Sequence, residues 1–126
     1  MNWNKLAFWR KREISLGRVH DTIVFREGSE SLRLRVDSDP MRMMAGLVQA
    51  QKQLEKWTDK TSIKAQKEFA LYFAGVIFGE EQAAQLLDFY RGSAGCVVNV
   101  CGQYFQNRLR HKIDKAVRSA QKKAET

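Results

Sequence analysis

Two histidines, two cysteines and a pair of adjacent glutamates are the residues with the most obvious chemical potential in this 126-residue chain. His20 and His111 each stand apart from any cysteine, serine or carboxylate arrangement that would form a catalytic pair. Glu80 and Glu81 are neighbours, and neighbouring side chains on a helix diverge instead of converging on one substrate. No phosphate-binding loop, dinucleotide-binding glycine motif or HExxH motif is present. We therefore expect no catalytic residues and no enzymatic activity.

The two cysteines do not indicate a disulfide or a metal site. Cys96 and Cys101 are five residues apart, so on a helix they point to different sides. They lack the CxxC spacing, and metal binding would need histidines clustered near them. We expect buried free thiols in a reducing compartment, with no metal and no cofactor.

The stretch from Phe69 to Phe105 is apolar at helical spacing, and it predicts three helices separated by glycines. Gly79 should end the first helix and Gly92 the second, while Ser93 should cap the third. Gly102 in the third helix is expected to permit close approach of a neighbouring helix. The third helix should carry an apolar stripe formed by Val98, Cys101, Phe105, Leu109, Ile113, Val117 and Ala120. The core residues that we predict are Phe73, Ile77, Leu87, Phe89 and Phe105.

A β-hairpin is predicted before these helices, within about residues 14–37. The run from Thr22 to Phe25 is rich in β-branched residues, residues 26–30 read as a turn, and apolar residues then alternate from Leu32 to Val36. An isolated hairpin is only marginally stable, so it must lie on the helices or on another chain. Asp39 and Pro40 then start a helix expected to run from residue 41 to about 57.

These elements predict a mainly α fold of the α+β class, with a bundle of about four helices preceded by a short antiparallel β-hairpin. A chain of this length forms one domain. We expect a basic aromatic arm at residues 1–12 and a single domain over 13–126, with its helical part at about 39–124. No apolar run reaches the length of a membrane span, and no secretory signal is evident at the start.

Two surfaces could bind a partner. Met41, Met43 and Met44 could form an adaptable face, although core filling is the commoner explanation for methionines, and Trp3 and Trp9 could dock on another subunit. The net charge of +8 is concentrated towards the C-terminus. A basic patch there contains Arg108, Arg110, Lys112, Lys115 and Arg118. It is either a solvated helix face or a phosphate-binding surface, so nucleic acid stays open as a partner.

Three segments, SLRLRVDSDPM, FGEEQAAQLLDFY and GCVVNVCGQYFQNRL, resemble a family of phage and prophage tail assembly chaperones encoded in the tail modules of siphophage-like elements from Gram-positive hosts. The resemblance covers about residues 13–123. It rests on packing and turn patterns, and it carries no site residues.

The resemblance implies a non-virion helper in the cytoplasm of the bacterial host. Such a helper would coat the tape-measure protein, help to recruit tail-tube subunits and form a homo-oligomer. A chain with adaptable methionines and a broad aromatic face suits that work, because it could cover apolar stripes that would otherwise aggregate. The alternatives are a basic nucleic-acid-binding module and a structural minor tail or connector subunit.

Overall fold

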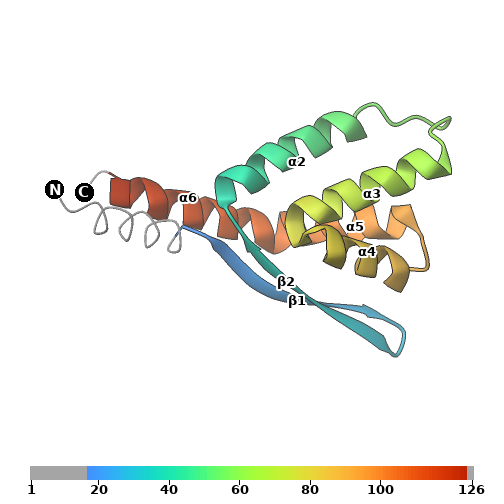
Figure 1. Ribbon diagram of the computed structural model, residues 1–126, viewed down its shortest axis with the longest axis horizontal. Helices are drawn as coiled ribbons and strands as arrows, with labels where there is room; N and C mark the ends of the chain where they lie inside the picture. Colours follow the sequence, from blue (N-terminus) through green and yellow to red (C-terminus); the bar gives the residue numbers. More distant parts are fainter. Residues whose placement is uncertain (1–16, 125–126) are drawn as a thin grey trace.

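The computed structural model describes residues 17–124, with side chains described up to residue 119. The predicted N-terminal arm, with Trp3 and Trp9, lies outside the described residues. An antiparallel hairpin comes first, followed by the helices (Figure 1). The elements are β1 (Val19–Glu27), β2 (Glu30–Ser38), α2 (Pro40–Leu54), α3 (Ile63–Phe78), α4 (Glu80–Phe89), α5 (Ala94–Tyr104), the π-helical turn η1 (Phe105–Leu109) and α6 (Arg110–Ala124). The predicted mainly helical α+β fold is confirmed.

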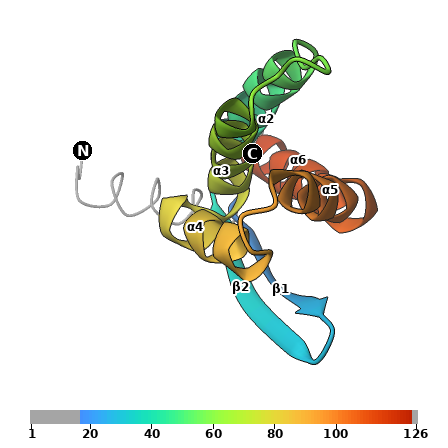
Figure 2. The same cartoon turned by 90° about the vertical axis from the view of Figure 1, so that its right-hand side faces the viewer.

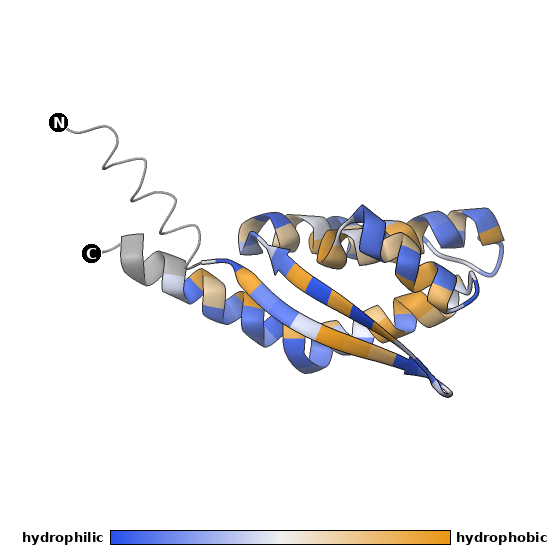
Figure 3. Ribbon diagram, turned by 60° about the horizontal axis from the view of Figure 1, so that its bottom comes forward, coloured by the Kyte–Doolittle hydropathy of each residue, from blue (hydrophilic) through white to orange (hydrophobic). Residues whose placement is uncertain are grey.

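The two strands pair in regular register, from Val19 opposite Ser38 to Glu27 opposite Glu30. Gly28 takes a φ of 60° at the first position of the two-residue turn, a conformation that glycine adopts without steric cost. Polar and apolar residues alternate along β2, whereas β1 contains a continuous apolar run, Ile23 to Phe25 (Figure 3). One face therefore lies on the helices, and Leu34 and Val36 are almost completely buried there.

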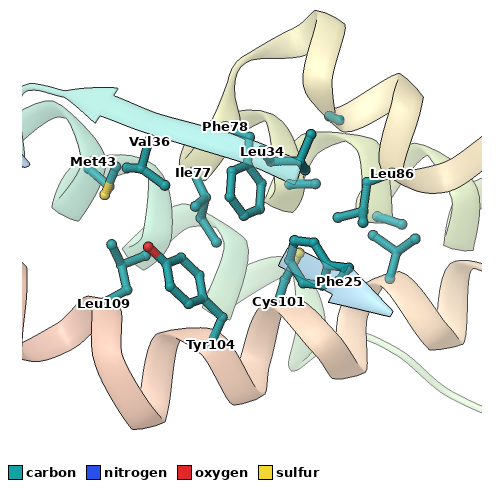
Figure 4. Packing of buried hydrophobic residues seen from close by; sticks show 14 of the residues in the cluster. Phe25, Leu34, Val36, Met43, Ile77, Phe78, Leu86, Cys101, Tyr104 and Leu109 are labelled. Atoms are coloured by element: carbon teal, nitrogen blue, oxygen red, sulfur yellow. The ribbon is translucent and has the colours of Figure 1, made fainter. Parts of the chain in front are cut away.

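Helix α3 is the centre of the fold, because it contacts α2, α4, α5 and β2. Figure 2 shows these elements arranged around it. Side chains from the hairpin and from the helices meet in one cluster (Figure 4). Within it the Phe25 ring packs edge-on against Phe78, and Phe78 stacks on Tyr104. The hairpin is thus held by the helical core.

Local signals set most helix ends where the sequence places them. Asp39 and Ser62 accept hydrogen bonds from the first turns of α2 and α3. Gly79, at a φ of 90°, ends α3 and begins α4, and Ser93 caps α5 as expected. Helix α2 ends at Leu54, three residues before the predicted end at Trp57.

The predicted core is only partly right. Ile77 is buried, whereas Phe73, Leu87, Phe89 and Phe105 are half-buried and pack on the edge of the cluster. The fully buried side chains belong instead to neighbours in the sequence and to the hairpin: Leu34, Met43, Leu86, Val97, Cys101 and Leu109. A helix that packs against several neighbours buries residues on more than one side. Its buried face can therefore be wider than the single apolar stripe in its sequence, or lie beside that stripe.

The predicted stripe along the last helix is displaced at three of its described positions: Val98, Phe105 and Val117 are only partly buried. The buried residues are Val97, Cys101 and Tyr104, then Leu109, Ile113 and Ala116 from the π-helical turn onwards. A π-turn closes i→i+5 hydrogen bonds and so inserts one extra residue into the helical repeat. As a result, Val98 and Phe105 lie beside the buried face and are only partly covered.

Close helix approach depends on a different glycine from the one expected. A Cβ on Gly102 would meet nothing within 4 Å, so the predicted role of that residue is wrong. A Cβ on Gly46 in α2 would lie 2.7 Å from Val76 Cγ1 in α3. Gly46 is therefore the position that lets α2 and α3 pack closely. No described helix is long and apolar enough to cross a membrane.

Candidate functional site: an apolar groove beside helix α2

An open groove runs between α2, α3 and the continuous rod formed by α5, η1 and α6, with a volume of about 730 Å³. Helix α2 rests on α3 and on α6. The space between these supports is lined by apolar side chains with a few polar ones. The main apolar lining residues are Met44, Leu47, Val48, Leu54, Phe69, Phe73, Val98, Phe105 and Ile113.

One wall of the groove is the apolar side of α2. Met44 is 41% exposed, Val48 51% and Leu54 41%, although all are large apolar residues on a helix that already packs on α3. Leu47 lies between them and is half-buried. Met44, Leu47 and Leu54 lie at i, i+3 and i+10 with Gln51 between the last two, so these side chains share one side of the helix and form a ridge along the groove.

The floor of the groove is aromatic, and its rings pack against one another and against Trp57. Phe69 and Phe73 lie one turn apart on α3, with ring centroids 5.9 Å apart. Trp57 packs edge-on against Phe69 at 5.2 Å and so supports one end of the floor. Phe69 is only 5% exposed and Phe73 is half-buried, so most of the accessible ring area of the floor belongs to Phe73.

The opposite wall is provided by the rod, and the π-helical turn shapes it. Phe105, Gln106 and Asn107 belong to this turn and all line the groove. Because the turn inserts an extra residue, it directs these side chains sideways while Tyr104 and Leu109 stay buried. π-turns are frequent at functional sites.

The groove is nearly uncharged. Its polar lining consists mostly of amides, contributed by Gln51, Asn99, Gln103, Gln106 and Asn107. The charged lining residues, Arg110 and Asp114, have opposite signs and lie one turn apart on α6. An apolar floor bordered by amides suits the apolar side of a peptide or helix, whose polar atoms could bond at the rim.

The predicted methionine face is divided by the fold. Met41 is 62% exposed, and Met44 lines the groove. Met43 is 1% exposed, so it is a core residue and is not available to a partner. Val48 and Leu54 also line the groove, although neither was among the predicted partner-binding residues. The sequence does contain a signal for this wall. Leu47 and Val48 are adjacent apolar residues, so they make the apolar face of the helix wider than one neighbouring helix can cover.

The predicted basic patch is also divided. Arg108 Nη2 lies 2.7 Å from Asp21 Oδ1 and Lys112 Nζ lies 3.9 Å from it, so both turn towards β1. Arg110 lines the groove. Lys115 and Arg118 border a shallow surface hollow with His111. The five cations therefore face several directions, and α6 does not present them as a single row.

Neither cysteine is in a disulfide. Cys101 is buried as expected, but Cys96 is exposed, which corrects the prediction that both would be buried. Burial raises the pKa of the Cys101 thiol to about 12. Within residues 17–124, no cluster of three or more His, Cys, Asp or Glu side chains is arranged to hold a metal ion.

His20 lies on the outer face of the hairpin, and its Nδ1 is 3.4 Å from Asp37 Oδ1. The Arg18 guanidinium donates to the same carboxyl, and that hydrogen bond lowers the pKa of Asp37.

No family model, curated protein or solved structure matches this chain.

Proposed function

We propose that this protein is a non-enzymatic tail assembly chaperone of a phage or prophage. It covers apolar helical segments of the tape-measure protein before the tail is built, and it helps to recruit tail-tube subunits. The resemblance of the sequence to tail assembly chaperones suggests this role. The observation that carries the proposal is the apolar groove beside α2.

The form of the groove favours a helix as its occupant. Helix-in-groove binding uses an apolar strip with anchors at i, i+3 or i+4, and i+7, pressed into a hydrophobic channel. On the ridge, Leu47 follows Met44 by three residues and Leu54 follows Leu47 by seven, and the ridge faces an aromatic floor. Met44 adds an unbranched, adaptable side chain at the rim, which suits a surface that must accept many different stretches of one long client.

The nearly neutral lining favours the apolar side of the client over a charged ligand. With Arg110 and Asp114 offsetting each other, the groove has little net attraction for an anion such as a phosphate. Rim amides can both donate and accept hydrogen bonds, so they tolerate varied polar residues at the edge of the client helix. This combination suits broad recognition of amphipathic helices.

Co-expression with the tape-measure protein of the same phage tests the proposal. We expect the chaperone to keep the tape-measure protein soluble and to copurify with it. Val48→Asp should abolish both effects, because it places a charge on the apolar wall that the client would have to bury. Gln49→Asp is the matched control: it puts the same charge on the next residue of the same helix, outside the groove lining.

Equal loss of copurification in both variants would contradict the proposal, as would retention in both. Salt separates this function from nucleic-acid binding. Apolar binding should persist as salt is raised, whereas phosphate binding weakens steeply. A complex that dissociates with rising salt and reforms on nucleic acid would support the basic-module alternative.

A further inference from the structure

The two outer edges of the hairpin are treated differently by the fold. On β2, the Gln82 side chain of α4 pairs with the Arg35 backbone in the manner of a neighbouring strand. Its Nε2 donates to Arg35 O at 2.7 Å, and its Oε1 accepts from the Arg35 N–H at 2.8 Å. The Arg18 guanidinium also donates to Asp37 O at 3.1 Å. The edge of β2 is therefore occupied.

These bonds identify the backbone groups that point outward on β1. Because the Arg35 N–H and C=O face away from β1, Arg35 and its partner Thr22 form a non-hydrogen-bonded pair. The N–H and C=O groups of Thr22 then also face away from the ladder, and by alternation so do those of Val24 and Arg26. Among the described residues, the bond given by these groups is a local one, from the Thr22 N–H to the Asp21 side chain at 2.9 Å.

The open edge of β1 lacks several of the usual protections of an edge strand, although the strand carries the charged Arg26 and the inward-pointing Asp21. Natural edges are shortened, bulged or interrupted by proline or lysine, because an open edge is a template for pairing with another chain. β1 has nine residues, keeps regular register and contains neither proline nor lysine. Val24, in its middle, is 40% exposed. The turn end of the hairpin also projects away from the helices, which leaves room for another strand (Figures 1 and 2).

We infer that β1 is a self-association edge, and that two copies of this chain pair their β1 strands antiparallel with Val24 opposite Val24. The hairpins of the two copies thereby form one four-stranded sheet. In this register Thr22, Val24 and Arg26 gain partners for their outward backbone groups. This interface is separate from the apolar groove and does not depend on the proposed function.

The side chains of β1 are compatible with this register. Val24 meets its own copy on the outer face, and Ile23 meets Phe25 on the face that carries the core. Arg26 of each copy stands opposite Thr22 of the other, so the two Arg26 side chains do not face each other. A shift by four residues, which places Thr22 opposite itself, would bring Arg26 against Arg18. At the ends of the chosen register, Glu27 stands opposite Asp21, whose charge is already paired with Arg108.

Sedimentation of the full-length chain at micromolar concentration tests the pairing. We expect a dimer or larger assembly in the wild type and a monomer in Val24→Pro. Proline removes the outward N–H of residue 24 but no bond of the hairpin ladder, so the fold should keep its helical circular dichroism. Val24→Thr keeps the N–H and the β-branched shape, and it should associate like the wild type. A monomeric wild type, or a folded proline variant that still associates as the wild type does, would overturn the inference.

Oxidative cross-linking tests the register and does not depend on how well the proline variant folds. In a Cys96→Ser background, which removes the exposed native thiol, Val24→Cys should form a disulfide dimer. Facing residues of a hydrogen-bonded antiparallel pair lie about 5.5 Å apart at Cα, within reach of a disulfide. Thr22→Cys is the matched control, since its facing residue is Arg26. Cross-linking of Thr22→Cys as readily as Val24→Cys would refute the Val24-centred pairing.

Discussion

Tyr104 Oη donates a 2.7 Å hydrogen bond to Asp21 Oδ2 and so joins residues 83 positions apart in the sequence. Arg108, one helical turn further on, donates to the other carboxylate oxygen at 2.7 Å. The Asp21 side chain is 5% exposed, so the hairpin places a carboxylate against the rod at the point where the π-helical turn begins. This contact fixes the hairpin to the rod and orients the turn that forms one groove wall.

Substitutions in this contact should differ in cost according to burial. Asp21→Ala removes the acceptor and leaves the buried Tyr104 hydroxyl unpaired, for a loss of about 2–3 kcal/mol in the free energy of unfolding. Tyr104→Phe removes one hydrogen bond and should cost about 1–2 kcal/mol. Arg108 is half-exposed, so Arg108→Ala should cost about 1 kcal/mol or less. Urea unfolding measures all of these, and a larger loss for Arg108→Ala than for Asp21→Ala would contradict this ranking.

Gly46→Ala should destabilise the protein, although alanine is the better helix former. The new Cβ would lie 2.7 and 2.9 Å from the two methyl carbons of Val76, and a β-branched side chain cannot easily rotate away. Overpacking of about 1–3 kcal/mol should exceed the helix-propensity gain of up to about 1 kcal/mol. Thermal unfolding measures the net effect.

A double-mutant cycle isolates this clash. In a Val76→Ala background, Gly46→Ala should become neutral or stabilising, because the obstructing methyl groups are gone. Gly75→Ala on α3 is the control, since its Cβ would meet nothing within 4 Å, and it should stabilise the helix. The same loss for Gly46→Ala in both backgrounds would show that Val76 is not the obstacle.

Gln82→Ala should release the outer edge of β2 locally. The Gln82 amide bonds to the N–H and C=O of Arg35, and it also donates to Phe78 O at 2.7 Å. We expect the Arg35 amide to exchange its hydrogen faster, together with a loss of about 1–2 kcal/mol in unfolding free energy. Gln85→Ala, an exposed position on the same helix, is the control. Unchanged exchange at Arg35 would contradict the pairing.

Native alkylation should distinguish the two cysteines. Iodoacetamide should modify Cys96, which is exposed, and leave Cys101 unmodified until the protein is unfolded in urea. Peptide mass spectrometry locates the modification. Rapid native modification of Cys101 would show that the contact between α5 and the core opens readily.

Alkaline pH should destabilise the fold through Cys101. Burial raises its pKa from 9.0 to about 12, so the folded state holds the thiol proton more tightly than the unfolded state does. Its contribution is fully present below about pH 9 and is lost as pH rises towards about 12, by about 1.4 kcal/mol per pH unit at most. Cys101→Ala should therefore show a shallower decline of unfolding free energy over this range. Equal slopes in the two proteins would contradict the assignment.

Tyr104 acts in the same direction, because its burial and then its hydrogen bond to Asp21 raise the pKa of its hydroxyl. Its contribution is lost above the pKa of an unfolded tyrosine. The Cys101 comparison is therefore made between proteins that both retain Tyr104, so the two effects are separated.

The sequence by itself determined the features that depend on neighbouring residues. Alternation from Leu32 to Val36 specified a strand, and Gly28 supplied the turn that makes it a hairpin. Asp39, Gly79 and Ser93 set helix ends, because capping bonds and positive φ angles act within a few residues. The fold class follows from this local information.

Only the tertiary structure decided which apolar residues are covered. Met43 is buried while Met44 lines the groove, and Cys101 is buried while Cys96 is exposed. These choices depend on where α3 and the hairpin lie, and the π-helical turn shifts the phase of the rod in a way no periodic pattern shows. The partner of Asp21 likewise lies 83 residues away. The groove exists because helices distant in the sequence leave part of the α2 face uncovered. A local sequence pattern cannot specify how far apart such helices lie in the fold.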